Sequence, residues 1–258
     1  MSVHAMPAKL GRSLRRLLAV CGLGVLCLPA VTSAAVFQTT LDQLIDDPRT
    51  PGVDESLTRG ITIGDKRYSG FVHNSTGSAP VAPEDVTVRV TNLESDPQRY
   101  TLQFTFAEDA FPGERTDLVI AYDLDVLSSD FINRVGLRFN GSVPAQGTNP
   151  NTSASVIETV RTRDGSDIQP GLPITDTLVL DVFNDGPGNL EDSNSEFQMV
   201  NLTRRLHFEK DIIVSSRPDG GYAAISIVDN VVDQVPEPTA FAIVSLVGGA
   251  MLLRRRRP

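Results

Sequence analysis

The chain has 258 residues with 32 acidic and 23 basic side chains, a net charge of −9, and it contains no tryptophan and two cysteines. This acidic balance excludes a surface built to bind the phosphates of nucleic acid, because such binding depends on many Lys and Arg contacts. Roughly 200 residues remain between the terminal segments described below, enough to form one hydrophobic core.

The N-terminal segment, residues 1–35, has the features of a secretory signal peptide. Its first part carries four Lys and Arg residues, an apolar stretch follows over 17–30, and small residues form a cleavage region that ends at Ala35. Both cysteines, Cys21 and Cys27, lie inside this segment. We therefore expect the secreted protein to contain no thiol and no disulfide, although its destination is oxidising.

The body between the two terminal segments is more acidic than the whole chain. All 32 acidic residues lie between Ala35 and Pro238, but only 15 of the 23 basic residues do, because four lie in each terminal segment, and the net charge of the body is therefore −17. A surface of this charge disfavours nucleic acid and anionic lipid as partners. It favours cations or neutral glycans.

The sequence pattern of the body predicts an all-β fold. A short helix is expected over 41–45, and from residue 61 onward apolar residues alternate with polar ones, as in strands with one face in a core. Turn pairs such as Asp185-Gly186 separate the apolar segments. We expect strands at 61–63, 68–72, 86–90, 100–106, 118–124, 135–139, 155–160, 178–182, 197–207, 212–214 and 223–228. This pattern predicts one antiparallel β-sandwich domain of jelly-roll type over 36–234.

Few residues of the body suit catalysis. After signal removal only His73 and His207 remain, and neither an HExxH nor a GxSxG motif occurs. Asp123 and Asp125 would share one face of a strand about 6 to 7 Å apart, a separation that suits a glycosidase. Such pairs arise by chance in a chain with 32 acidic residues. We therefore expect no enzymatic activity, with a secreted glycan hydrolase as the alternative.

A polar loop in the second half of the body is a candidate calcium site. It presents the oxygen donors Asp185, Asp192, Asn194 and Glu196, which are the ligand types that Ca²⁺ prefers. Phe197 stands where an EF-hand loop requires glycine, so that motif fails. The alternative to a calcium site is a solvated connection between two strands.

The C-terminal segment, residues 235–258, combines three features in order. A Pro-Glu-Pro motif precedes an uncharged apolar run over 239–253, which as a helix would reach about 22 Å, less than the ~30 Å hydrocarbon core of a bilayer. A cluster of arginines follows the run and would stay on the cytoplasmic side. The motif is Val235, Pro236, Glu237 and Pro238, and the cluster is Arg254, Arg255, Arg256 and Arg257.

This order of features resembles the C-terminal sorting signal of PEP-CTERM proteins. In that family the segment is recognised and processed by an exosortase, a membrane enzyme of bacteria that make extracellular polysaccharide. The resemblance implies secretion through the bacterial inner membrane, transient anchoring there by the C-terminal helix, and exosortase as a partner. An ordinary C-terminal anchor is the alternative, but it does not explain the Pro-Glu-Pro motif.

Short segments of the body also resemble one group of PEP-CTERM proteins, in the order 63–71, 155–159, 209–212 and 224–227. The resemblance implies an extracellular domain linked to exopolysaccharide or biofilm and carries over no catalytic residue. From the residues themselves, Gly64-Asp65-Lys66 predicts a hairpin turn.

Together these features predict a secreted structural or binding component of the cell envelope or extracellular matrix, with extracellular polysaccharide as a candidate partner. A calcium-dependent adhesin and a glycan-binding module are the alternatives. Glycan binding needs exposed aromatic side chains, and the sequence does not decide which tyrosines are exposed. The candidates are Tyr68, Tyr100, Tyr122 and Tyr222.

Overall fold

The computed structural model describes residues 35–45, 59–93, 96–143, 152–163, 168, 177–185 and 195–236. The signal peptide up to residue 34, Glu237, Pro238, the apolar run 239–253 and the arginine cluster lie outside the described residues, and the predictions about them stay predictions. Among the residues described, no helix is both long enough and apolar enough to cross a membrane.

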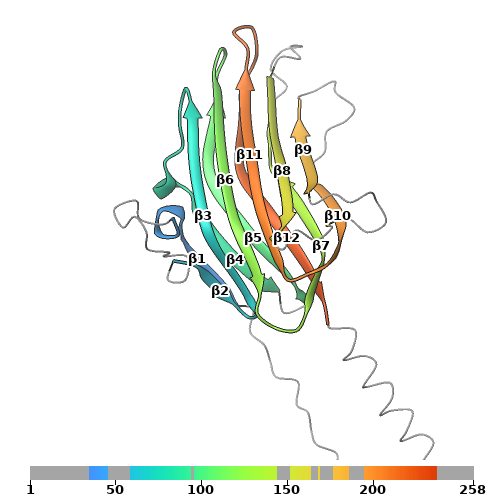
Figure 1. The fold of residues 1–258 in the computed structure, drawn as a ribbon. Coiled ribbons are helices and arrows are strands. Elements are labelled where there is room, and N and C mark those ends of the chain that lie inside the picture. The colour runs from blue at the N-terminus through green and yellow to red at the C-terminus, as the bar shows by residue number, and fades with distance from the viewer. Residues whose placement is uncertain are drawn as a thin grey trace, which may run out of the picture. The chain divides into compact units, whose positions relative to one another are not determined.

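In the part of the chain that the structure describes, two antiparallel sheets of six strands pack face to face, which confirms the predicted β-sandwich (Figure 1). Sheet 1 has the order β1-β4-β5-β12-β7-β10, and sheet 2 has the order β2-β3-β6-β11-β8-β9. Successive strands alternate between the two sheets from β5 to β8, and they do so again from β9 to β12. The strands are β1 (Val36–Thr40), β2 (Ile61–Ile63), β3 (Lys66–Gly77), β4 (Thr87–Leu93), β5 (Asp96–Ala110), β6 (Arg115–Val126), β7 (Phe131–Phe139), β8 (Thr152–Thr162), β9 (Thr177–Asn184), β10 (Ser195–Thr203), β11 (Arg205–Ser216) and β12 (Ala223–Val235).

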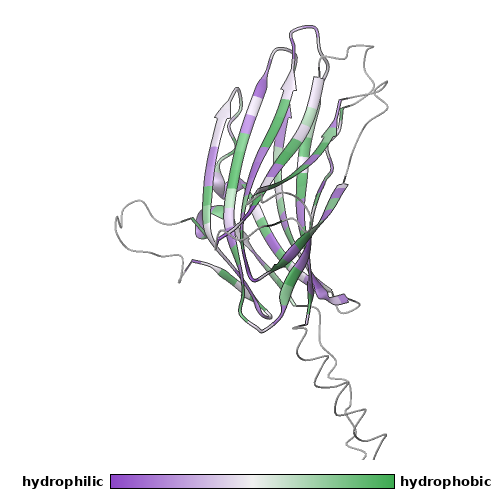
Figure 2. Ribbon diagram, turned by 45° about the vertical axis from the view of Figure 1, so that its right-hand side comes forward, coloured by the Kyte–Doolittle hydropathy of each residue, from purple (hydrophilic) through white to green (hydrophobic). Residues whose placement is uncertain are grey.

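The core lies between the sheets, because apolar residues recur at every second position along the strands. Hydrophobic and hydrophilic residues alternate along the strands (Figure 2), so strands such as β5 and β11 present their apolar side chains to the facing sheet. Tyr122 lies at the centre, with Phe208 stacked on it at 4.9 Å between ring centroids and Phe104 from sheet 1 at 5.9 Å. Each fully buried large apolar side chain contributes about 1.5–3 kcal/mol, which makes this layer the main source of stability.

The predicted hairpin at Gly64-Asp65-Lys66 is confirmed. Ile63 pairs with Lys66 across a two-residue turn, and Gly64 has φ 58°, a left-handed value that favours glycine. Asp65 accepts hydrogen bonds from Lys66 Nζ at 2.6 Å and from Tyr100 Oη at 3.1 Å. The turn is thereby fastened to sheet 1.

Four predicted elements differ from the structure. The expected strand 197–207 is two strands, because the chain leaves β10 at Thr203, passes Arg204 and enters β11 in the other sheet. The expected strands 212–214 and 223–228 are the ends of longer strands, which continue through buried polar residues that interrupt the apolar pattern. The expected helix 41–45 is only a 3₁₀ turn, η2 (Leu41–Gln43). A second such turn is η4 (Pro83–Asp85).

Both ends of the described body lie at the same end of sheet 1. Val36 pairs with Thr91, Thr91 with Thr101, and Thr101 with Val231, four residues before the end of β12. We call this end of the sandwich the proximal end. The opposite, distal end carries the β5–β6 turn and the β11–β12 loop (Figure 1).

Candidate functional site

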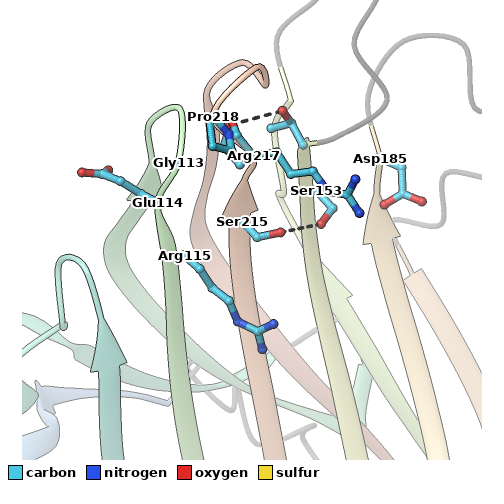
Figure 3. Close-up of a pocket in the computed structure, with 10 residues that line it drawn as sticks. Gly113, Glu114, Arg115, Ser153, Asp185, Ser215, Arg217 and Pro218 are labelled. Carbon is cyan, nitrogen blue, oxygen red and sulfur yellow. Dashed lines mark hydrogen bonds between the residues drawn. The ribbon is translucent and has the colours of Figure 1, made fainter.

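A polar pocket of about 490 Å³ opens at the distal end of the sandwich. Residues from four separate parts of the chain line it: the β5–β6 turn, the start of β8, the residue after β9, and the end of β11 (Figure 3). We call it the distal pocket. Its lining residues are Gly113, Glu114, Arg115, Thr152, Ser153, Asp185, Ser215, Ser216, Arg217 and Pro218.

Backbone hydrogen bonds hold the floor of the distal pocket. Gly113 N donates to Ser216 O at 2.9 Å, and Ser216 N donates to Glu114 O at 2.8 Å, so the β5–β6 turn is fastened to the end of β11. Gly221 N donates to Thr152 Oγ1 at 2.8 Å, which fastens the β11–β12 loop to β8. Gly113 has φ 89°, a backbone conformation that favours glycine. The pocket is therefore preformed by elements that the two sheets fix in place.

The side chains of the distal pocket supply paired donors and acceptors. Ser153 Oγ and Ser215 Oγ share a hydrogen bond of 3.1 Å, and the Arg115 guanidinium donates to Asp117 at 2.8 Å. Within the part of the chain that the structure describes, the exposed Arg217 guanidinium has no ion-pair partner, and it extends toward Asp185 (Figure 3). Guanidinium, carboxylate and hydroxyl groups together can satisfy a ligand with many hydroxyls.

Two exposed aromatic rings lie beside the distal pocket. Phe111 and Tyr222 are 53% and 37% exposed, and their ring centroids are 5.4 Å apart. Phe111 belongs to the turn that lines the pocket, since its N–H donates to Glu114 Oε2 at 2.9 Å. We call these two residues the aromatic pair. The other candidate tyrosines, Tyr68, Tyr100 and Tyr122, are buried in the core.

A second pocket of about 460 Å³ lies on sheet 1, and several of its polar groups form hydrogen bonds with other groups of the protein. Gln103 Nε2 donates to Asp229 Oδ1 at 2.9 Å, and Asn140 Oδ1 accepts from Ile227 N at 2.7 Å. Burial raises the pKa of Asp229. Because these groups already bond to one another and its lining ring, Phe139, is buried, this pocket is the weaker candidate for ligand binding.

The paired carboxylates Asp123 and Asp125 share one face of β6, as the strand pattern predicts, but each is engaged by cationic side chains. Asp123 Oδ1 lies 2.8 Å from His207 Nδ1, and Arg163 bridges the pair with contacts of 3.4 Å to Asp123 and 3.2 Å to Asp125. His73, the other histidine, is half-buried on β3, where burial lowers its pKa. The two carboxylates therefore serve a surface ion-pair network.

The predicted calcium ligands are only partly placed. Asp192 and Asn194 lie outside the described residues, whereas Asp185 lies at the distal pocket and Glu196 lies in β10. Glu196 accepts hydrogen bonds from Asp181 N at 2.6 Å and Gln198 Nε2 at 2.9 Å. Among the residues that the structure describes, no group of three or more His, Cys, Asp or Glu side chains is arranged to hold a metal ion.

Of the sorting motif, Val235 and Pro236 are described. Val235 ends β12 and pairs with Phe131, so the strand of sheet 1 runs up to the residue before Pro236. Glu237, Pro238 and Arg254 to Arg257 lie outside the described residues. The link to the predicted sorting segment therefore leaves the body at its proximal end.

No protein-family model matches the chain, and no curated protein does. Among solved structures the chain is similar to the carbohydrate-binding module TmCBM61 in complex with β-1,4-galactotriose, with 13% identity, a TM-score of 0.27, and coverage of 64% of this chain and 88% of that chain. It is also similar to the enzymatically active domain of bacteriophage CBA120 tailspike protein 4, with 14% identity, a TM-score of 0.24, and coverage of 62% of this chain and 19% of that chain. Likenesses at these TM-scores carry no conclusion on function.

Proposed function

We propose that this chain is a secreted polysaccharide-binding β-sandwich that is sorted at the cell envelope through its C-terminal PEP-CTERM-like segment. The observation that carries the proposal is the distal pocket with the aromatic pair beside it. Polar groups that bind hydroxyls and an aromatic face that accepts the apolar face of a sugar ring are the two parts that a glycan site needs.

The location of the pocket supports display on an anchored protein. Ala35 and Pro236 both lie at the proximal end, and the distal pocket lies at the other end of the same strands. A body held at the membrane through the segment after Pro236 therefore presents its pocket away from the membrane. This arrangement gives a sorted protein access to polymer outside the cell.

The charge of the body selects the class of glycan. A net charge of −17 repels polyanions at long range, so a neutral polysaccharide is favoured over a polyuronate. Within the pocket, Arg115 is neutralised by Asp117, and the carboxylates Glu114 and Asp185 add acceptors. These groups suit hydroxyl recognition better than recognition of an acidic sugar.

Affinity electrophoresis of the full chain tests the proposal, with soluble mannan, xylan and β-glucan as neutral polymers and alginate as the acidic one. We expect retardation by at least one neutral polymer and not by alginate. Arg217→Ala and Tyr222→Ala should each weaken that binding about tenfold. Arg205→Ala and Phe37→Ala, which remove an exposed arginine and an exposed aromatic ring elsewhere on the sandwich, should leave the binding unchanged.

Binding that survives both substitutions in the distal pocket would place the glycan elsewhere on the protein. Absence of retardation by every polymer would count against a glycan-binding role.

The sorting half of the proposal is tested by a deletion that the structure defines. Removal of residues 237–258 leaves β12 complete through Val235, so the body should fold and pass into the medium. Retention of this deletion variant at the cell surface, in the same amount as the intact chain, would contradict sorting by the C-terminal segment.

A further inference from the structure

Four polar side chains form a buried cluster between the two sheets. Lys210 on β11 and Glu158 on β8 have no exposed surface, and Asn230 on β12 and Tyr122 on β6 are 2% and 1% exposed. We call these four residues the interior cluster. It joins both sheets, because β12 belongs to sheet 1 and the other three strands belong to sheet 2.

One carboxylate in the interior cluster holds both an amine and an amide. Lys210 and Glu158 are directly opposite each other on paired strands, and Lys210 Nζ contacts Glu158 Oε2. From the facing sheet, Asn230 Nδ2 donates to Glu158 Oε1 at 2.7 Å and to Oε2 at 2.8 Å. The Lys210 amine and the Asn230 side-chain amide therefore meet at Glu158 Oε2.

The carbonyl of the Asn230 amide has its own donor. Tyr122 Oη donates a hydrogen bond of 2.7 Å to Asn230 Oδ1, and this bond draws electron density away from Cγ. The surroundings are aromatic, since the rings of Tyr122 and Phe208 lie 5.6 and 5.8 Å from Lys210 Nζ. The polarised Asn230 amide and the Lys210 amine thus lie beside the same carboxylate in a buried site.

The ammonium form of Lys210 would have more hydrogen-bond donors than the interior cluster has acceptors for it. A lysine ammonium has three N–H donors, but among the described residues Glu158 is the only acceptor that Nζ contacts. Burial lowers the pKa of Lys210 well below its usual value, which favours the neutral amine. A buried ion pair of this kind contributes little to stability compared with apolar residues of the same volume. Its geometry instead suits a reaction.

We propose that Lys210 and Asn230 become joined by an isopeptide bond inside the folded protein, with Glu158 as the proton carrier and Tyr122 as the donor that stabilises the oxyanion. This inference is independent of the glycan-binding proposal. It rests on the interior cluster alone.

The reaction balances without an oxidant, a reductant or a cofactor. The neutral Nζ of Lys210 attacks Cγ of Asn230, and the negative charge that develops on Oδ1 is stabilised by Tyr122 Oη–H. Glu158 takes one proton from Nζ and gives one to Nδ2, the Cγ–Nδ2 bond breaks, and ammonia leaves. The product is a secondary amide between the two side chains.

The bond would tie the last strand of the body to the facing sheet. Asn230 lies five residues before Val235, at which the predicted sorting segment begins, so force on that segment would reach β12 first. A covalent link at Asn230 would stop β12 from being pulled out of sheet 1. In a body without cysteines, it would serve the purpose that a disulfide serves in other secreted proteins.

Peptide mass spectrometry of the full wild-type chain, denatured and digested with trypsin, tests the inference. We expect cleavage after Lys66, the other fully buried lysine, but none after Lys210. The peptide that contains Lys210 and Asn230 should be about 17 Da lighter than its sequence, the mass of the ammonia that a lysine nucleophile displaces. Chymotryptic cleavage at Tyr222, between the two residues, should leave two fragments that remain joined. Normal cleavage after Lys210 with an unmodified Asn230 would overturn the proposal.

Two substitutions test the roles within the cluster. Glu158→Gln keeps the size of the side chain but removes the proton carrier, so its tryptic digest should contain the free Lys210 terminus and no joined peptide. Tyr122→Phe should slow formation of the bond, and the joined fraction should rise with time after synthesis. A fully joined Glu158→Gln protein would refute the role of Glu158. The wild-type measurement decides whether the bond exists even where a variant fails to fold.

Discussion

Glu108 should make the protein less stable as the pH rises, because its carboxyl is buried without a partner. The side chain on β5 is 2% exposed, and within the described part of the chain neither of its oxygens has a hydrogen-bond partner. Burial, together with the carboxylates of Asp117 on β6 and Asp211 on β11, raises the pKa of Glu108 to about 8.

The sign of the effect follows from the two pKa values. In the unfolded chain Glu108 ionises near its ordinary pKa of 4.5, whereas in the folded protein it stays protonated until about pH 8. The unfolded state is therefore favoured progressively as pH rises from about 4.5 to about 8, and the full cost applies above pH 8. At about 1.4 kcal/mol for each unit of pKa, the cost reaches at most about 5 kcal/mol, a large part of the 5–15 kcal/mol of a typical domain.

Urea unfolding of the wild-type chain and of Glu108→Gln at pH 5, 7 and 9 measures this cost. The amide has nearly the same size as the carboxyl and does not ionise. The free energy of unfolding of the variant should therefore rise relative to that of the wild type by several kcal/mol between pH 5 and pH 9. Glu84→Gln, which changes an exposed glutamate, is the matched control and should show no such trend. A difference between wild type and Glu108→Gln that stays constant from pH 5 to pH 9 would refute the argument.

Three further predictions concern the core, the hairpin and calcium. Phe208→Ala should lower the free energy of unfolding by about 3–5 kcal/mol, because the ring is fully buried in the central aromatic layer, and urea denaturation measures the loss. Gly64→Ala should cost about 1–3 kcal/mol in the same assay, since its φ is 58° and a Cβ atom would lie 2.6 Å from Tyr100 Oη. Because the Glu196 carboxylate already accepts the Asp181 N–H, we expect neither excess EDTA nor added Ca²⁺ to change the Tm. A rise in Tm with Ca²⁺ would favour the calcium site instead.

The sequence predicted the all-β fold well where one face of a strand is purely apolar. β6 follows this rule, since Leu118, Ile120, Tyr122 and Leu124 alternate with outward-facing residues, and all four are buried. The β2–β3 hairpin was equally predictable, because its glycine marks the turn. The alternation of apolar and polar residues is a local property of the sequence. It predicts a strand correctly wherever the buried positions of that strand are apolar.

The prediction failed where polar residues point inward. Lys210 occupies a core position of β11 and Asn230 a core position of β12, so the sequence predicted that β11 begins only after Lys210 and that β12 ends before Asn230. Each residue contacts a partner distant in sequence, Glu158, which no local pattern reveals. The interior cluster is thus both the reason for the wrong strand boundaries and the feature with the most distinctive chemistry.

The candidate site was not predictable for a related reason. The distal pocket is assembled from four parts of the chain that only the crossing of strands between the two sheets brings together. Its residues, such as Ser153, Ser215 and Arg217, are ordinary surface types in the sequence. Tyr222 was one of four candidate tyrosines, and only the packing of the core distinguishes it from the three that are buried.

The most direct test of the account is the affinity of the full chain for a neutral polysaccharide before and after the double substitution Arg217→Ala/Tyr222→Ala. The account predicts that the intact chain binds and that the double variant, with unchanged thermal unfolding, loses the binding. Equal affinity of the two proteins would contradict the assignment of the distal end as the glycan site.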